Sequence, residues 1–209
     1  MAVMQIMNFR CSYIILENIK SPADVKKLDR HQLDILAEEM RHALLKKLSI
    51  HGGHCGPNFG MVEATIALHR VFNSPEDKIV FDVSHQTYPH KMLTGRAYGF
   101  LDESRYDDIT GYSSPEESEH DFFTVGHTST SVSLACGLAK GRDLVGGNEN
   151  IIAVIGDGSL SGGEALEGLA SASKENFGLP VFSSKGIHQC QSSLFCSASG
   201  KPLPFSVTI

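Results

Sequence analysis

The run IIAVIGDGSLSGGEALEGL, residues Ile151 to Leu169, constrains the fold of this chain more than any other segment. Its first five residues are apolar and mostly β-branched, as in a buried strand of a parallel sheet. Two glycines around Asp157 then permit a sharp turn. Beyond the turn, apolar residues recur at helical spacing, which predicts a helix that begins between Ser161 and Glu164.

Asp157 is expected at the carboxyl end of this strand, beside the N-terminus of a helix. Open α/β sheets bind ligands at that edge, and helix N-termini attract phosphate. A carboxylate suits Mg²⁺ or Ca²⁺, and Mg²⁺ commonly pairs one or two carboxylates with substrate phosphates. The segment therefore favours a metal–diphosphate site. From the residues alone, an ordinary strand–turn–helix in which Asp157 caps the helix is an equal alternative.

Several other classes of protein fit poorly. The order GDGSLSGG is neither the G-x-G-x-x-G of a Rossmann site nor a Walker A loop, because no Gly-Lys-Ser/Thr follows. The net charge of −6 argues against a nucleic-acid partner. No apolar run approaches the ~20 residues of a membrane span, and the start lacks the pattern of a signal peptide. The five irregularly spaced cysteines are typical of reduced thiols, so we expect a cytoplasmic protein.

Helices and strands alternate along the chain, which predicts an α/β domain with a parallel sheet flanked by helices. A strand is expected over 78–83, and helices are expected to start at Ser21-Pro22 and to cover 33–48, 61–71 and 130–144. In the helix over 33–48, one face is apolar and the polar residues are expected to point outward, namely Asp34, Glu38, Glu39, Arg41 and Lys46. The polar, acidic stretch 101–121 is expected to be a surface excursion.

The pattern changes after Leu169. The remainder is rich in Ser and Gly, and its best strand candidate, 179–182, contains a proline. We therefore divide the chain into an unassigned leader (1–17), a folded domain (18–169) and an atypical, non-homologous tail (170–209).

Four segments in order carry a resemblance to a known family. They are HGGHCGPNFGMVEATIALHRVF (His51–Phe72), FDVSHQTYPHKMLTGR (Phe81–Arg96), VGHTSTSVSLACGLAKGRDL (Val125–Leu144) and GDGSLSGGEALEGL (Gly156–Leu169). Together they resemble the amino-terminal domain of 1-deoxy-D-xylulose-5-phosphate synthase, a thiamine-diphosphate enzyme of the transketolase superfamily. The resemblance implies a thiamine-diphosphate-binding fold that carries the diphosphate and metal half of the site and is incomplete at its C-terminus.

The resemblance also implies an activity and its residues. Family members condense pyruvate with glyceraldehyde 3-phosphate, release CO₂, and are expected to be homodimers that use thiamine diphosphate and Mg²⁺. His54 and His85 match proton-handling positions, which suits imidazoles because their pKa lies near neutral pH. The expected cofactor contacts are His85, Gly126, His127, Thr128, Gly158 and Ser159, and the expected metal ligand is Asp157.

Some positions depart from the family pattern or lack a matched role. Ser84 replaces a common glycine, and Thr128 replaces a serine while keeping its hydroxyl. Lys91 and Arg96 are interpreted as solvated, or as attracting a phosphorylated substrate. His51 is expected at the surface, and His90 is expected to be structural.

Two parts of the family site have no counterpart here. The second metal ligand should be an Asn about 25–30 residues after Asp157, and the window Phe182–Ile187 contains none. The glutamate that activates the aminopyrimidine cannot be assigned. We therefore expect the isolated chain to be an inactive fragment. The alternatives are a half-subunit of a transketolase-type enzyme of other specificity and a non-catalytic fragment that binds no cofactor.

Overall fold

The computed structural model describes residues 13–175, 177–184 and 194–197. Within these residues a sheet runs in the order β1-β2-β3-β4. Its strands are β1 (Lys78–Phe81), β2 (Ile151–Gly156), β3 (Pro180–Ser184) and β4 (Leu194–Ser197). The first three are parallel and β4 is antiparallel to β3. The predicted α/β fold with a parallel sheet is confirmed.

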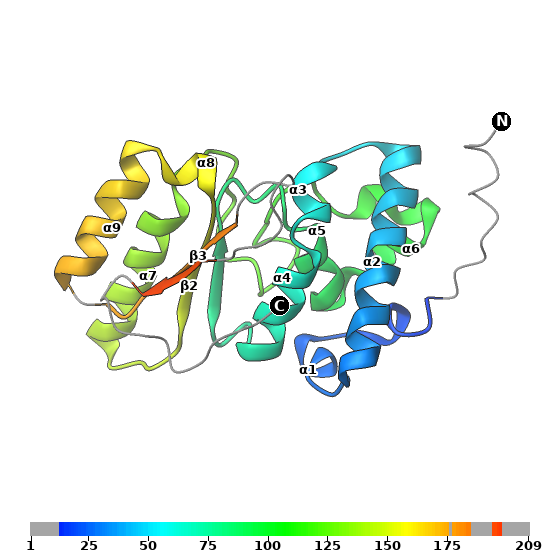
Figure 1. Cartoon of the computed structure of the whole chain (residues 1–209), viewed down its shortest axis with the longest axis horizontal. Coiled ribbons are helices and arrows are strands. Elements are labelled where there is room, and N and C mark those ends of the chain that lie inside the picture. Colours follow the sequence, from blue (N-terminus) through cyan, green and yellow to red (C-terminus); the bar gives the residue numbers. More distant parts are fainter. Residues whose placement is uncertain (1–12, 176, 185–193, 198–209) are drawn as a thin grey trace.

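Helices surround this sheet and extend well beyond one side of it (Figure 1). They are α1 (Pro22–Val25), α2 (Arg30–His51), α3 (Gly56–Phe59), α4 (Val62–Val71), α5 (Tyr88–Lys91), α6 (Tyr98–Leu101), α7 (Ser131–Val145), α8 (Asp157–Leu160) and α9 (Gly163–Glu175). Shorter turns are η2 (Leu16–Asn18), the distorted η3 (Met92–Arg96) and η4 (Glu103–Asp108). The predicted helices are confirmed, and α9 begins inside the expected interval.

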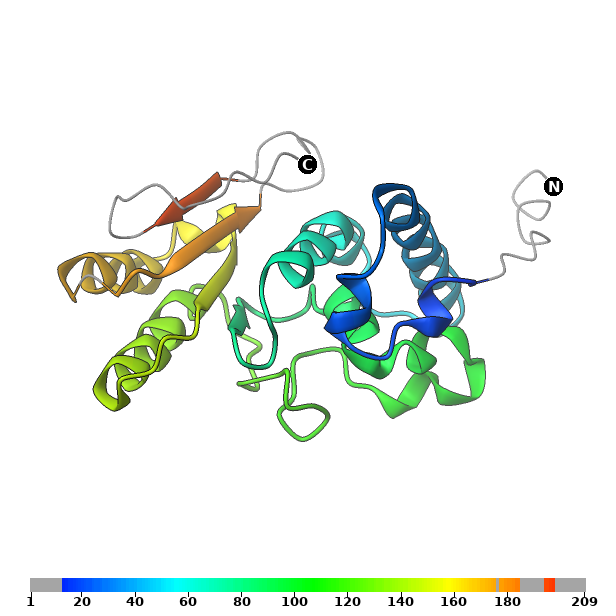
Figure 2. The same ribbon diagram turned by 90° about the horizontal axis from the view of Figure 1, so that it is seen from below.

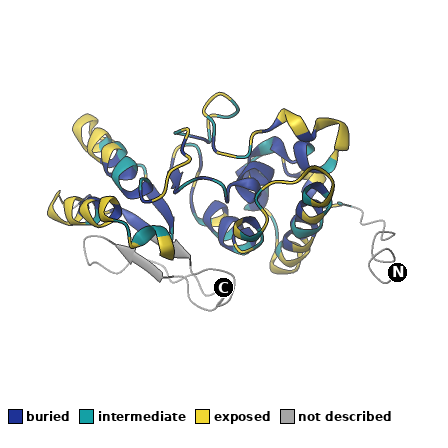
Figure 3. Ribbon diagram, turned by 90° about the horizontal axis from the view of Figure 1, so that it is seen from above, coloured by how far each residue is buried: buried dark blue, intermediate teal, exposed yellow. Residues whose placement is uncertain are grey.

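Strand β2 is apolar along its length because both of its faces are covered. Ile151, Ala153 and Ile155 belong to a core with α7 and α9, whereas Ile152 and Val154 belong to a core with α4 and β1. Figure 2 shows α7 and α9 on one side of the strands and α4 on the other. Strands β1 and β2 are accordingly largely buried while the outward faces of the helices are exposed (Figure 3).

A third apolar core lies among the helices on the far side of α4. Leu36, Met40 and Leu44 on α2 are four residues apart, so they share one helix face, and all three are fully buried. They belong to one cluster with Met92 and Phe100. Asp29 and Gln32 form a capping box at the start of α2.

One residue of α2 contradicts its predicted orientation. Glu39 was expected to point outward, but it is only 4% exposed. Its carboxylate accepts the backbone N–H groups of Ile15 and Leu16, the latter at 2.7 Å. The helical pattern assigns a charged residue such as Glu39 to the polar face. It contains no information about the N–H groups, distant in sequence, that bind this carboxylate in the interior.

Regular structure also continues past Leu169, contrary to expectation. Helix α9 runs to Glu175, and β3 pairs with β2 in parallel register. Pro180 is the first residue of β3, a position at which its missing N–H is tolerated. The rest of the tail, 185–193 and 198–209, lies outside the described residues. The domain boundary at 169/170 stays a prediction.

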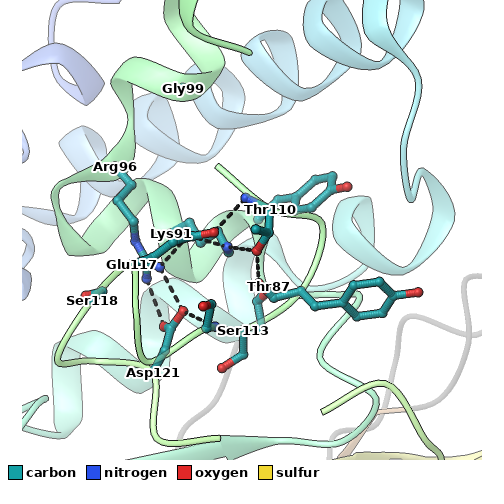
Figure 4. A network of polar contacts seen from close by, with 12 residues as sticks. Thr87, Lys91, Arg96, Gly99, Thr110, Ser113, Glu117, Ser118 and Asp121 are labelled. Atoms are coloured by element: carbon teal, nitrogen blue, oxygen red, sulfur yellow. Dashed lines mark hydrogen bonds and ion pairs between the residues drawn. The ribbon is translucent and has the colours of Figure 1, made fainter. Parts of the chain in front are cut away.

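The interpretation of Lys91 and Arg96 as solvated is wrong. Lys91 is fully buried and Arg96 is 4% exposed. They pair with two acidic residues of the 101–121 segment, Glu117 at 2.6 Å from Lys91 and Asp121 at 2.8 Å from Arg96 (Figure 4). No exposed charge remains on either cation to meet a substrate phosphate, and the segment expected at the surface sends these carboxylates inward.

Next to this network lies a group of buried histidines. Nε2 of His69 is 2.9 Å from Nδ1 of His90, and Nε2 of His90 donates to Asp121 at 3.1 Å, so His90 is structural, as expected. Burial lowers the pKa of His69 and of His90 below the usual value. Burial, followed by the nearby charge of His90, lowers the pKa of His120 to about 4.

We predict that this cluster makes the fold sensitive to acid. Because the folded-state pKa values are depressed, the unfolded chain binds more protons once the pH falls below about 6.5. The contribution to stability is complete above that pH and is lost as the pH falls towards 4. Urea denaturation at pH 7.5 and pH 5 should show a lower free energy of unfolding at pH 5.

The matched variants are His120→Gln and His31→Gln, since His31 is exposed on α2 and lies outside the cluster. The first should reduce the loss of stability between the two pH values, and the second should not. An equal pH dependence in His120→Gln and the unchanged chain would contradict the assignment.

Candidate functional site

Asp157 lies where β2 ends and α8 begins. Its side chain is exposed, and its carboxylate accepts the N–H of Gly158 at 2.9 Å. Asp157 is the first residue of α8, whose N-cap is Gly156 and which has no side-chain cap, so the capping that the sequence left open is not observed at this helix. The exposed carboxylate is therefore accessible to a cation.

The segment Gly126–Ser131 lies beside this turn. The hydroxyl of Ser129 donates to the carbonyl of Ser159 at 2.7 Å. At Gly162 a Cβ would lie 2.9 Å from Cβ of Ser129 and still closer to its Oγ, so only glycine allows this approach. The contact brings the predicted diphosphate residues Gly126, His127 and Thr128, all exposed, to the same sheet edge as Gly158 and Ser159.

A carboxylate that the sequence reasoning missed holds this segment from behind. Asp82 directly follows β1 and is 1% exposed. One of its oxygens accepts the N–H of Ser129 at 3.0 Å and the other accepts the N–H of Ser131 at 2.9 Å. It caps α7 from a distance, since Thr130 makes no side-chain cap. Its place after a strand, which is the same as that of Asp157, was the available signal.

The turn after Asp82 has an unusual backbone. Val83 and Ser84 have φ values of 57° and 66°, a region that side chains other than glycine rarely adopt. This conformation explains why glycine suits position 84. Here the serine hydroxyl donates to the carbonyl of Val125 at 2.7 Å and accepts the N–H of Ser113 at 3.0 Å, which offsets the strain.

The two candidate catalytic histidines are neighbours. The ring centroids of His54 and His85 are 5.5 Å apart with an interplanar angle of 81°. Nδ1 of His54 lies 3.4 Å from the hydroxyl of Tyr88. Burial, and then the nearby His54, lowers the pKa of His85. Nδ1 of His85 is buried with no hydrogen-bond partner among the described residues, and the lowered pKa favours the neutral form of this half-buried imidazole.

Asn58, a second residue that was missed, fastens this pair. It is fully buried, and its amide donates to the carbonyls of His54 and His85 at 2.7 and 2.8 Å. Its side-chain oxygen accepts the N–H of Tyr88 at 2.9 Å. The glycine-rich loop, the turn after β1 and α5 are thus joined at one side chain. Nothing in HGGHCGPNFG distinguishes this Asn from a loop residue.

Hydrogen bonds therefore link the glycine-rich loop, the turn after β1, the segment before α7 and the turn after β2. The predicted site residues lie in these segments. In contrast, no group of three or more His, Cys, Asp or Glu side chains within the described part of the chain is placed to hold a metal. The donors fit an anion bound over exposed backbone, because a Cβ at Gly126 or Gly158 would meet open space. A cation at Asp157 would need phosphate oxygens or further ligands to complete its shell. Also within the described residues, no helix is long and apolar enough to cross a membrane.

Comparison with known proteins identifies the family. Residues 16–182 match the family model described as 1-deoxy-D-xylulose-5-phosphate synthase, so the match extends past Leu169. The 1-deoxy-D-xylulose-5-phosphate synthase of Halalkalibacterium halodurans is 53% identical over 154 residues, which cover 74% of this chain and 24% of that protein. The 1-deoxy-D-xylulose-5-phosphate synthase 2 of Geobacter sulfurreducens is 52% identical over 167 residues, or 80% of this chain and 27% of that protein.

The 1-deoxy-D-xylulose-5-phosphate synthase of Corynebacterium diphtheriae is 52% identical over 166 residues, which cover 78% of this chain and 26% of that protein. The chain spans about a quarter of the length of these relatives. Of the alternatives, a half-subunit of a transketolase-type enzyme of other specificity is not favoured by these matches. The chain belongs to the 1-deoxy-D-xylulose-5-phosphate synthase family, as a segment of its amino-terminal part.

Proposed function

We propose that this segment is the diphosphate- and metal-binding part of a synthase that condenses pyruvate with glyceraldehyde 3-phosphate and releases CO₂, the first step of non-mevalonate isoprenoid precursor synthesis. The proposed cofactors are thiamine diphosphate and Mg²⁺. The observation that carries the proposal is the position of these residues at one sheet edge. Asn58 joins His54 to His85 after β1, and Asp82 in the same turn holds the segment whose Ser129 contacts the turn after β2. Family membership and about 50% identity to named synthases support the proposal.

The cofactor's anionic end would lie over the exposed backbone of two turns. Gly158 and Ser159 follow β2, and Gly126, His127 and Thr128 precede α7, so exposed backbone and a hydroxyl would lie on both sides. The Nδ1 of His127 donates to the carbonyl of Thr128 at 2.9 Å, which orients the imidazole at this turn. Asp157 would bind Mg²⁺ together with the diphosphate.

The two histidines would manage protons. Bound thiamine diphosphate supplies the carbanion chemistry. Partial burial lowers the pKa of His85 and so favours its neutral form, and Asn58 holds the backbone of both histidines. One imidazole could then accept a proton while the other orients a substrate oxygen. The rings of Tyr88 and Tyr112 pack against His54.

For the complete protein we propose a cytoplasmic homodimer with small-molecule substrates, and neither a nucleic acid nor a membrane as partner. The acidic charge supports the exclusion of nucleic acid. The isolated chain is proposed to be inactive. It spans about a quarter of its relatives, and the residues that would hold the aminopyrimidine cannot be assigned within it.

We predict that His54→Ala lowers kcat about 10²- to 10⁴-fold in a full-length synthase that carries this segment, because it removes a general acid or base. The affinity for the cofactor should change little. Steady-state kinetics and cofactor titration are the measurements. His51→Ala is the control, since His51 ends α2 beside the same loop, is exposed, and pairs with Asp107. An unchanged kcat in His54→Ala would show that this histidine is a loop residue.

We predict that the isolated 209-residue chain binds thiamine diphosphate with Mg²⁺ at millimolar affinity or not at all. Loss of even an outer partner at a metal site costs about 10–100-fold in affinity, and Asp157 lacks its expected Asn partner. Calorimetric titration of the chain is the test, with Asp157→Ala and, as control, Glu164→Ala on the exposed start of α9. Micromolar binding that disappears only in Asp157→Ala would overturn the prediction.

A further inference from the structure

Tyr112 lies against the candidate catalytic histidine although the sequence gave it no role. Its ring centroid is 5.0 Å from that of His54 at an interplanar angle of 67°. This is closer than His85 at 5.5 Å or Tyr88 at 6.1 Å. Tyr112 is 38% exposed, so it covers His54 from the solvent side. The preceding residue, Gly111, also lies against His54, since a Cβ at Gly111 would be 3.4 Å from Cε1 of that imidazole.

The backbone on both sides of Tyr112 is fixed. On one side, the N–H of Thr110 donates to Glu117 at 2.6 Å and its hydroxyl donates to the carbonyl of Tyr112 at 2.8 Å. On the other side, the N–H of Ser114 donates to Asp121 at 2.9 Å. Two carboxylates of one short segment therefore hold the residues that flank this tyrosine.

Those carboxylates are in turn held by buried cations. Glu117 pairs with Lys91 and Arg96, and Asp121 pairs with Arg96 through both oxygens at 2.8 and 2.9 Å. Lys91 also donates to the hydroxyl of Thr110 at 3.2 Å. Figure 4 shows the cations pointing from α5 and η3 into the segment that contains Thr110, Ser113, Glu117 and Asp121.

A buried network of two cations and two anions is weak evidence for stability, because apolar replacements often serve as well. It does restrict the chain to one arrangement, since any displacement leaves a buried charge unpaired. Here the hydrogen bonds of the network end on the neighbours of a single, partly exposed aromatic residue. That placement indicates that the network holds the tyrosine ring in position beside His54.

We propose that the segment Thr110–Asp121 is a rigid wall of the reaction site and that Tyr112 is a positioning residue for His54. The proposal rests on the proposed function of His54. The tyrosine ring blocks rotation of the imidazole on its outer side and limits its contact with water, while the network fixes the tyrosine. Thr110, Lys91 and Glu117 act through Tyr112 and touch no substrate.

The first test uses the 209-residue chain without cofactor. Ring-proton signals of His54, identified by their loss in His54→Gln, are measured by NMR in three variants. Tyr112→Leu removes the ring current, Thr110→Val releases one flank, and the double variant Lys91→Met/Glu117→Gln removes one cation and one anion together. Glu116→Gln is the matched control, because Glu116 is an exposed neighbour outside the network.

We expect the His54 signals to move in Tyr112→Leu and to move in the same direction in Thr110→Val and the double variant. Glu116→Gln should leave them unchanged. Amide signals of β2 and α7 report whether each variant is folded. If the double variant does not fold, Thr110→Val, which keeps all the charges, provides the test by itself. Unchanged His54 signals in folded Thr110→Val would overturn the proposal.

The second test uses a full-length synthase that carries this segment. A misplacement of about 1 Å can cost about 10²-fold in rate, so Tyr112→Leu should lower kcat about 10- to 100-fold while the KM for cofactor is unchanged. Tyr112→Phe should restore kcat, because the ring does the positioning. Loss of turnover in His54→Ala but not in Tyr112→Leu overturns this inference alone. Unchanged turnover in both overturns the proposed catalytic role of His54, and the inference with it.

Discussion

The arrangement of the candidate site depends on the buried carboxylate of Asp82. It lies at the end of β1 and accepts one backbone N–H on each oxygen, from Ser129 and from Ser131. Without it, two N–H groups would be buried without a partner, at about 1–3 kcal/mol each. These bonds fix where α7 begins, and through Ser129 they fix the distance between the segment before α7 and the turn after β2. The Asp82 side chain thus joins the turn after β1 to the segment before α7, which is far away in sequence, and this connection assembles the candidate site at the sheet edge.

The same edge contains structure that is unfavourable by itself. Val83 and Ser84 adopt positive φ values, and such residues cost about 1–3 kcal/mol each. A few residues further along the chain, the charged side chains of Lys91 and Arg96 are buried. Specific hydrogen-bond and ion-pair partners compensate both the strained turn and the buried charges. The strained turn fixes the position of His85, and the buried network fixes the position of Tyr112. Strain and buried charge are concentrated around the imidazoles, whereas the apolar cores that supply stability lie on the two faces of β2 and on α2.

The sequence predicts the apolar parts of this fold well and the polar parts poorly. Residues 151–155 indicate a strand buried on both faces, and the spacing of Leu36, Met40 and Leu44 indicates a buried helix face, because these patterns are local. Burial of a charge depends on partners elsewhere in the chain. Arg96 can be buried because it pairs with the buried Asp121, and the sequence near either residue does not indicate this pair. Asn58 and Asp82 were missed for the same reason. The strand β3 was doubted because of Pro180, whose place at the first position of the strand cannot be read from composition. The candidate residues themselves came from resemblance, and the sequence alone left Asp157 as either a ligand or a cap.

The two halves of the candidate site differ in how far this chain organises them. His54 and His85 are held by buried hydrogen bonds and by rings on several sides, so their geometry is set before any ligand binds. Asp157 is exposed, and its one hydrogen bond in the structure is to the N–H of the next residue. A carboxylate in that state gains its orientation only when a cation and its other ligands arrive. The geometry of the two histidines is therefore a property of this segment, whereas binding of the proposed cofactor at Asp157 would depend on further ligands. It follows that mutations around Asn58 and Tyr112 should act on turnover, and that completing the protein should act on binding.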